Sequence, residues 1–155
     1  MNDYQFFLEV AKACAKQSTC LRRRYGAVIV NPVNRTIIST GFNGAPRGKP
    51  HCTDTKSCIR VKLNIPMGEQ YQWCVSNHAE ANAVLQSGQS VNGCVMYLYG
   101  WDVELNREII PKPCFMCNKL LLNAGIEKVI TYQCIFDMHD LFDSYISELY
   151  QKIDN

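Results

Sequence analysis

The apolar positions of the chain follow two periods, one typical of helices and one typical of strands. Residues 3–17 and 138–153 repeat apolar side chains at helical spacing, and both segments are predicted to be amphipathic helices. Two β-rich runs, Ala27–Val30 and Thr36–Thr40, flank a short Asn/Pro turn and predict a hairpin. The near-continuous apolar run over residues 94–100 predicts a strand that is buried on both faces.

Two more helices and one more strand complete the pattern. Helices are expected over residues 77–86, before Gly88, and over residues 113–125, with Pro113 at the start and Gly125 at the end. The remaining segments are a strand over 127–132, a Gly- and Pro-rich loop over 41–58, an ambiguous stretch over 59–75 and a surface hairpin or loop over 101–112. The order α-β-β-α-β-α-β-α predicts a layered α/β domain over residues 1–155, one sheet with helices on both faces.

Composition narrows the class of protein. A chain of 155 residues with 47% apolar content suits one domain with its own core. The 16 basic and 14 acidic side chains nearly balance, which argues against a general nucleic-acid surface. No apolar run approaches the roughly 18–20 residues of a membrane span, and the N-terminus lacks the features of a signal peptide. We therefore expect a cytoplasmic protein with neither a membrane nor a nucleic acid as partner.

The cysteines fit a reducing compartment. Their number, nine, is odd, and no secretory signal precedes them. In such a compartment cysteines are core residues, metal ligands or catalytic thiols, and most are expected to be core residues. Only cysteines at ligand spacing are candidates for chemistry.

Cys114 and Cys117 have such a spacing, C-x-x-C, at the start of a predicted helix. Residues i and i+3 share one helix face, and the free N–H groups of a helix start stabilise thiolates. His78 also lies in the first turn of a predicted helix, just after Asn77 as a predicted N-cap. Two helix starts that follow strands of one α/β sheet can point into the same crevice. One histidine and two cysteines would leave the fourth position of a zinc ion open, as in catalytic zinc sites.

Glu80 lies two residues beyond His78 and therefore points to another side of the helix turn. It can stand beside the metal without binding it, where a carboxylate can take a proton from a zinc-activated water. In an alternative interpretation, Asn77 and Glu80 form a capping box and Glu80 is structural. The C-x-x-C alone would also suit a redox motif or a structural zinc. The combination H-x-E…P-C-x-x-C is more specific, because it is the signature of zinc nucleobase deaminases.

The segments GAVIV, STGFNGAPRG, HAEANAV and PCFMC…NAGIEKVI occur in this order over about residues 5–132. On these segments the chain resembles the cytidine and deoxycytidylate deaminase family, and within it the deoxycytidylate enzymes. The resemblance implies a three-layer α/β/α cytidine-deaminase-like fold with a mixed five-stranded sheet, in dimers or larger oligomers up to hexamers. It implies that His78, Cys114 and Cys117 bind one catalytic Zn²⁺ and that Glu80 is the proton shuttle.

The reaction that the resemblance implies is hydrolytic deamination of dCMP to dUMP with release of ammonia, which supplies dUMP for thymidylate synthesis. Zinc-bound hydroxide attacks C4 of the pyrimidine, and Glu80 protonates N3 and then the leaving ammonia. In the family the backbone around Ala79 binds the base and an Asn that falls on Asn43 contacts the nucleoside. Related enzymes are often regulated by dCTP and dTTP, so both are candidate effectors here.

A nucleotide substrate also requires cations for its 5′-phosphate. Arg22, Arg23, Arg24 and Arg47 lie beside the segments that are predicted to form the site. The alternative is that Arg22–Arg24 are only a solvated connector. The segment between the 94–100 strand and Pro113 is longer than is usual in the family.

A second metal site is also a candidate. His51, Cys52 and Cys58 lie close together in the sequence, Cys20 or Cys74 could join them, and some relatives carry a structural zinc nearby. The alternative is a cysteine-rich packed loop, and His139 is expected to be an ordinary surface residue. Two competing functions remain at this point: deamination of another nucleoside or of a tRNA base, and a zinc-stabilised assembly module without catalysis.

Overall fold

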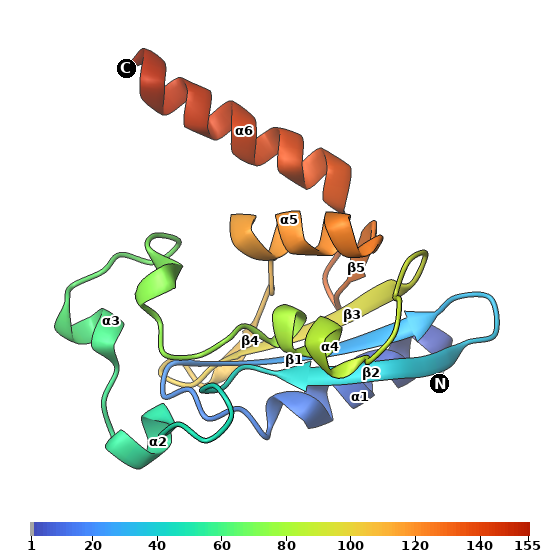
Figure 1. Cartoon of the computed structure of the whole chain (residues 1–155), viewed down its shortest axis with the longest axis horizontal. Coiled ribbons are helices and arrows are strands. Elements are labelled where there is room, and N and C mark those ends of the chain that lie inside the picture. The colour runs from blue at the N-terminus through green and yellow to red at the C-terminus, as the bar shows by residue number, and fades with distance from the viewer. Residues whose placement is uncertain (1) are drawn as a thin grey trace.

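The computed structural model describes residues 2–155, whose strands form one mixed sheet (Figure 1). The strands are β1 (Arg23–Asn31), β2 (Thr36–Phe42), β3 (Val95–Asp102), β4 (Arg107–Ile109), β5 (Lys128–Ile130) and β6 (Ile135–Asp137). The sheet order is β2-β1-β3-β5-β6, and β4 pairs with β3. Strands β3 and β5 are parallel, while all other pairs are antiparallel.

The mixed α/β sheet is confirmed, but it has six strands where five were expected. The hairpin of β1 and β2 is confirmed, and β4 forms the surface hairpin that was one of two interpretations of residues 101–112. The additional strand is β6, which pairs antiparallel with β5 over three residues. A strand this short shows too few alternations to be recognised as a pattern in the sequence.

Alternating side chains of β1 serve two separate core layers, as the two-residue period of a strand requires. Val28 and Val30 face helix α1 (Asp3–Ala15), which packs Phe7 and Leu8 against them. Ala27 and Ile29 belong to the opposite layer, to which three helices contribute: α4 (Ala79–Gln86), α5 (Phe115–Ala124) and α6 (Met138–Asp154). Figure 1 shows α1 on one side of the sheet and α5 on the other. Helices therefore cover both faces, as predicted.

Close backbone packing fixes helix α4 on strand β2. A Cβ atom at Gly41 would lie 2.4 Å from the Ala83 nitrogen and 2.5 Å from the Ala79 oxygen, so only glycine permits this approach. The Ser39 hydroxyl adds a 2.6 Å hydrogen bond to the Ala83 carbonyl. The start of α4, where His78 and Glu80 lie, is thus held at a defined height above the sheet.

Short helices and a buried arginine organise the segment that the sequence left ambiguous. Its helices are α3 (Ile59–Lys62) and the 3-10 helix η1 (Tyr71–Trp73), and the four-residue helix α2 (Cys52–Thr55) precedes it within the segment 41–58, which was predicted to be a loop. Arg60 is 5% exposed, and its guanidinium donates to the carbonyls of Pro66 (2.9 Å), Glu69 (2.7 Å) and Gln70 (3.0 Å). One side chain thereby replaces the regular backbone pairing that the loop lacks.

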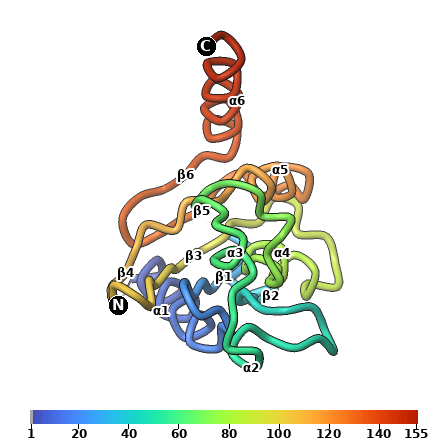
Figure 2. The backbone as a smooth tube through the Cα atoms, turned by 90° about the vertical axis from the view of Figure 1, so that its left-hand side faces the viewer, coloured from blue at the N-terminus to red at the C-terminus, as the bar shows by residue number. Residues whose placement is uncertain are grey.

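Helix α6 packs its beginning on α5 and then extends away from the rest of the molecule (Figures 1 and 2). Met138 and Leu141 are buried, whereas Leu149 and Ile153 are 42% and 74% exposed. None of the helices in residues 2–155 combines the length and the apolar character that crossing a bilayer requires.

Candidate metal centre and active site

The starts of α4 and α5 bring the three predicted metal ligands together. Cys114 is the N-cap of α5, and its sulfur accepts a hydrogen bond from the Cys117 N–H at 3.5 Å. The predicted helix start at Pro113 was therefore two positions early, because Pro113 precedes the cap and the helix begins at Phe115. His78 is the N-cap of α4. Both ligand-bearing segments are thus held in extended backbone conformation immediately before a helix.

The prediction that Asn77 caps α4 was wrong. Asn77 instead pairs with Gly44 through two backbone hydrogen bonds of 2.8 and 3.2 Å, one residue outside the cap. This long-range bridge determines where the chain enters the helix and prevails over the local preference of asparagine for an N-cap. Without Asn77 at the cap, Glu80 is not the third residue of a capping box, and that alternative for Glu80 fails.

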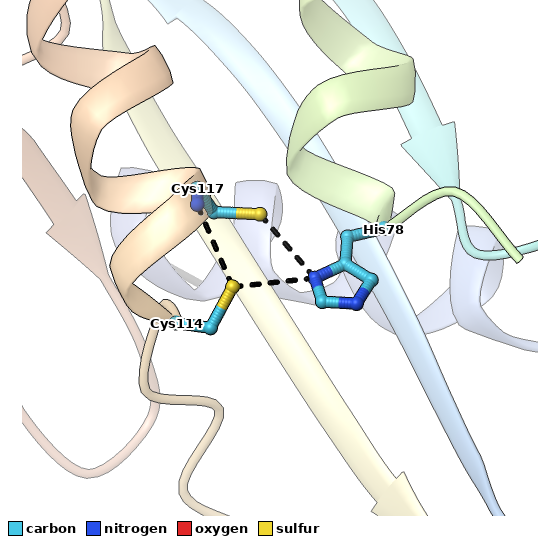
Figure 3. A group of neighbouring side chains, drawn as sticks. All are labelled: His78, Cys114 and Cys117. Atoms are coloured by element: carbon cyan, nitrogen blue, oxygen red, sulfur yellow. Dashed lines mark hydrogen bonds between the residues drawn. The ribbon is translucent and has the colours of Figure 1, made fainter. Parts of the chain in front are cut away.

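The three ligand atoms lie as a compact group (Figure 3). His78 Nδ1 is 3.5 Å from Cys114 Sγ and 3.4 Å from Cys117 Sγ. In residues 2–155 they are the one set of three or more His, Cys, Asp or Glu side chains whose ligand atoms all lie within 4.8 Å of one another. One imidazole and two sulfurs are the donor set of catalytic zinc sites with an open fourth position, so these residues fit a zinc ion.

The two cysteines differ in protonation before a metal binds. A hydrogen bond from the Cys117 thiol, together with His78, lowers the pKa of Cys114 to about 4. The Cys117 pKa is raised, first by its hydrogen bond to Cys114 and then by burial. These contacts favour the thiolate form of Cys114, and bound Zn²⁺ would favour it on Cys117 as well.

Glu80 lies in the first turn of α4 and is 5% exposed. It lines the same cavity as His78 and Cys114, a space of about 120 Å³ with Leu98 and Pro111 among its apolar walls. Burial raises the Glu80 pKa, and the adjacent imidazole of His78 partly opposes this shift. A carboxyl group in such an environment holds a proton more readily than an exposed one, which suits acid–base work.

The predicted substrate-binding residues separate into two groups. Asn43, Arg22 and Arg23 line the cavity, and Ala79 is fully buried at the start of α4. The Asn43 amide is held by hydrogen bonds with the Tyr25 N–H (2.9 Å) and the Arg23 carbonyl (2.9 Å), which fixes its orientation.

Two of the four predicted phosphate-binding arginines are not brought to the cavity. Arg24 lines a different cavity, beneath α1 with Lys12 and Lys16, because neighbouring residues of β1 point to opposite faces. Arg47 lies on the exposed loop after β2 and does not line the cavity. The interpretation of Arg22–Arg24 as a connector was also wrong in part, since Arg23 and Arg24 begin strand β1.

Eight residues that line the cavity were not predicted, and four of them are basic or aromatic. Arg60, Tyr71, Tyr25 and Lys112 all line it, and the Tyr71 ring meets the His78 ring edge-on at 4.9 Å. The sequence could have indicated Lys112, because it lies between two prolines and only two residues before Cys114. No sequence pattern indicated Arg60 and Tyr71, since they lie in residues 59–75, where the apolar positions show no clear period.

The residues of the candidate second metal site do not meet as a ligand set. His51 Nδ1 is hydrogen-bonded to the Thr19 hydroxyl at 2.9 Å and to the Ala45 N–H at 3.3 Å. The four remaining residues share one region and are Cys20, Cys52, Cys58 and Cys74. Burial, followed by the charges of the other three thiols, raises the Cys52 pKa.

The fold and the centre together define a class: α/β proteins with a zinc-type donor set and a buried glutamate beside it. Residues 1–133 match the family described as the cytidine and deoxycytidylate deaminase zinc-binding region. The chain belongs to this family.

Similar proteins carry deaminase names. The chain is 32% identical to the deoxycytidylate deaminase of Schizosaccharomyces pombe over 94% of its own length, but it spans only 40% of that protein. It is 35% identical to the deoxycytidylate deaminase of Mycobacterium phage D29, covering 81% of this chain and 91% of that protein. The dCMP deaminase of cyanophage S-TIM5, solved in apo form and with dCMP and dUMP, shares the fold. For the apo form the TM-score is 0.59 at 22% identity, over 91% of this chain and 90% of that chain.

Proposed function

We propose that this protein, as one deaminase domain over residues 1–155, catalyses the zinc-dependent hydrolytic deamination of dCMP to dUMP and ammonia. The main support is geometric. The ligand atoms of His78, Cys114 and Cys117 lie together, and the buried carboxyl group of Glu80 lines the same cavity. The choice of dCMP is supported by the relatives named deoxycytidylate deaminase and by the S-TIM5 structure that contains dCMP and dUMP. The product would supply thymidylate synthesis.

The side chains of the site have two proposed roles in the reaction, metal binding and proton transfer. His78, Cys114 and Cys117 would hold Zn²⁺. As a Lewis acid, this ion would lower the pKa of a water molecule and make it nucleophilic near neutral pH. Glu80 takes a proton from the attacking water and delivers it to N3 of the pyrimidine. A C4–O bond forms, and Glu80 takes the remaining proton from the new C4 hydroxyl group. Glu80 transfers this proton to the exocyclic nitrogen, and the C4–N bond breaks to release ammonia. The buried position of Glu80 excludes bulk water from these proton transfers.

The nucleoside and the phosphate of the substrate are proposed to contact different residues of the cavity. Asn43 and the backbone around Ala79 are proposed to bind the nucleoside, and Arg22 and Arg23 to face the phosphate. The fixed orientation of the Asn43 amide supports this role, because a preorganised group loses little entropy on binding.

The test compares dCMP with deoxycytidine at saturating concentrations in zinc-replete protein, by ammonia release and ultraviolet change. Rapid conversion of dCMP and slow conversion of deoxycytidine are expected. Conversion of another base would reassign the substrate, and no conversion of any base would favour the non-catalytic assembly module. The same assay with added dCTP or dTTP tests the proposed effectors.

A second, structural zinc is also proposed, with Cys20, Cys52, Cys58 and Cys74 as its ligands and without His51. Four thiolates would close the coordination shell, as structural sites require. The sulfurs would have to move closer together when the metal binds, since they do not form a group within 4.8 Å. Two zinc ions per chain, falling to one in Cys58→Ser, are expected by metal analysis of fresh protein; one zinc per chain in the unaltered protein would exclude the site.

We also propose a cytoplasmic location and a homo-oligomer, from dimer to hexamer. The location is supported by nine free thiols, which persist in reducing compartments. Self-association is supported by the exposed apolar side chains on the far half of α6, among them Leu149, Tyr150 and Ile153.

A further inference from the structure

Lys112 has an unusually fixed backbone for an exposed residue at the mouth of the cavity. It stands between Pro111 and Pro113, both fully buried, and its own N–H donates to the Ile110 carbonyl at 3.0 Å. Proline fixes its own φ and restricts the residue before it to extended conformations. Lys112 also lines the cavity, two residues before Cys114. The direction in which its side chain leaves the backbone is therefore set by the covalent structure.

Tyr145 holds this segment from the other side. Its hydroxyl donates to the Pro113 carbonyl at 2.6 Å, and its ring lies 5.4 Å from the ring of Phe115, the first residue of α5. The Lys112 Nζ lies over the Tyr145 ring, 4.8 Å from its centroid. A cation above an aromatic face is attracted by the ring's charge distribution. Tyr145 belongs to α6, beyond the residues 1–133 that match the family.

Of the three other cations that line the cavity, Arg22, Arg23 and Arg60, two are already engaged. Arg60 is buried and donates to three backbone carbonyls of its own loop. Arg23 pairs with Asp102, with 3.5 Å between Nε and Oδ2. Across residues 2–155, in contrast, Lys112 has no carboxylate within ion-pair distance. Its ammonium group is therefore not committed to a carboxylate, and within the same residues Arg22 is the other cation of the cavity without such a pair.

We propose that Lys112 is a specificity-determining residue whose ammonium group binds the 5′-phosphate of the substrate nucleotide, and that Tyr145 is the positioning residue that holds it at the cavity. This inference rests on the proposed deaminase function. The flanking prolines and the aromatic ring reduce the entropy that a flexible lysine would lose on binding a phosphate. Unlike Arg22 and Arg23, Lys112 is attached directly to the segment that bears the predicted metal ligand Cys114.

The test is the kinetics of Lys112→Gln with dCMP and with deoxycytidine. Hydrogen bonds to charged groups contribute enough that we expect the KM for dCMP to rise about tenfold or more. The kcat for dCMP and the kcat/KM for deoxycytidine should stay within about twofold, because the lost contact is made only with the phosphate. Lys112→Arg should restore most of the affinity. Lys119→Gln is the matched control, since Lys119 also lies over an aromatic ring, Phe115, but does not line the cavity.

Two variants separate the ring of Tyr145 from its hydroxyl group. Tyr145→Phe keeps the ring beneath Lys112 and should keep the low KM for dCMP, whereas Tyr145→Leu should raise it as Lys112→Gln does. A merely structural role would instead lower the activity on dCMP and deoxycytidine equally. An unchanged KM for dCMP in folded Lys112→Gln would overturn the inference. If the unaltered protein does not deaminate dCMP at all, the proposed function fails instead.

Discussion

At the scale of single residues, the separation of two positions between His78 and Glu80 has a structural explanation. His78 is the N-cap of α4, where its extended backbone lets the imidazole reach the two sulfurs on α5. Glu80 is already in the first turn and buried, so it faces the cavity without competing for the metal. A ligand and a proton carrier can thus stand next to each other on one helix start.

Replacing Glu80 by Gln should leave the zinc content unchanged and lower kcat by about 10²–10⁴-fold, because the amide cannot carry a proton. The measurement is kcat for dCMP together with zinc per chain. Glu104→Gln, an exposed position in the β3–β4 turn, is the control and should behave like the unaltered protein. Full activity in zinc-replete Glu80→Gln would remove Glu80 from the mechanism.

Zinc should protect Cys114 from alkylation. After a chelator has removed the metal, iodoacetamide is expected to modify Cys114, whose thiolate is favoured by its neighbours. Added Zn²⁺ should suppress this modification, and restore any lost activity, because metal-bound thiolates are poor nucleophiles. Mass spectrometry of the peptides reads the result. The exposed Cys134 serves as the internal control and should react equally with and without zinc; equal labelling of Cys114 in both states would contradict a zinc ligand there.

At the scale of secondary-structure elements, the position of α4 on β2 determines the geometry of the centre. Gly41→Ala would place a Cβ inside contact distance of the α4 backbone, so the helix would have to shift. We expect the free energy of unfolding to fall by about 1–3 kcal/mol, the usual range for overpacking. Because His78 and Glu80 move with the helix, kcat/KM should also fall, by up to about 10²-fold for a displacement near 1 Å.

Chemical denaturation and steady-state kinetics measure these two effects of Gly41→Ala. Thr36→Ala, at the exposed far end of the same strand, is the control and should change neither quantity appreciably. A Gly41→Ala protein with unchanged stability and activity would show that α4 is not held by this contact.

The elements also show how far the sequence predicts this structure. Helices of eight or more residues and the buried strand β3 have enough periods for recognition, and the pairing of H-x-E with P-C-x-x-C predicted which side chains meet. The three-residue strand β6 carries no usable period. The N-cap at His78 depends on the bridge between Asn77 and Gly44, which are far apart in the sequence.

The residues that line the cavity were harder to predict than the candidate metal ligands, because many of them lie in segments without a sequence pattern. Arg60 enters the cavity wall because it binds the carbonyls of its own irregular loop, an arrangement that has no sequence pattern. Arg24 was assigned to the site on proximity to Arg22 and Arg23, but the alternation of the strand turns it to the opposite face. Proximity in the sequence thus identified the segment that contributes to the cavity, but it did not show which side chains face the cavity.

At the scale of the whole molecule, the far half of α6 is the part that a single chain leaves without a partner. Leu149 and Ile153 are one helical turn apart on the same face, and both are exposed. The helix extends beyond the body of the molecule in both views (Figures 1 and 2). An apolar helix face of this kind is stable in water when a second surface covers it, which favours association of chains through α6.

The double variant Leu149→Lys, Ile153→Lys should therefore shift the protein toward a monomer, because two charges on this face cannot be buried in an interface without a large desolvation cost. Light scattering over a range of protein concentrations measures the mass. Ser147→Lys, Gln151→Lys is the matched control: it adds the same charge, at the same spacing, to exposed polar positions of α6, and should keep the mass of the unaltered protein. If the unaltered protein is monomeric, or if both double variants keep the same oligomeric mass, α6 is not the association surface. The residues of the cavity and of the metal centre all come from one chain, so a monomeric double variant that retains deaminase activity would place association outside the chemistry.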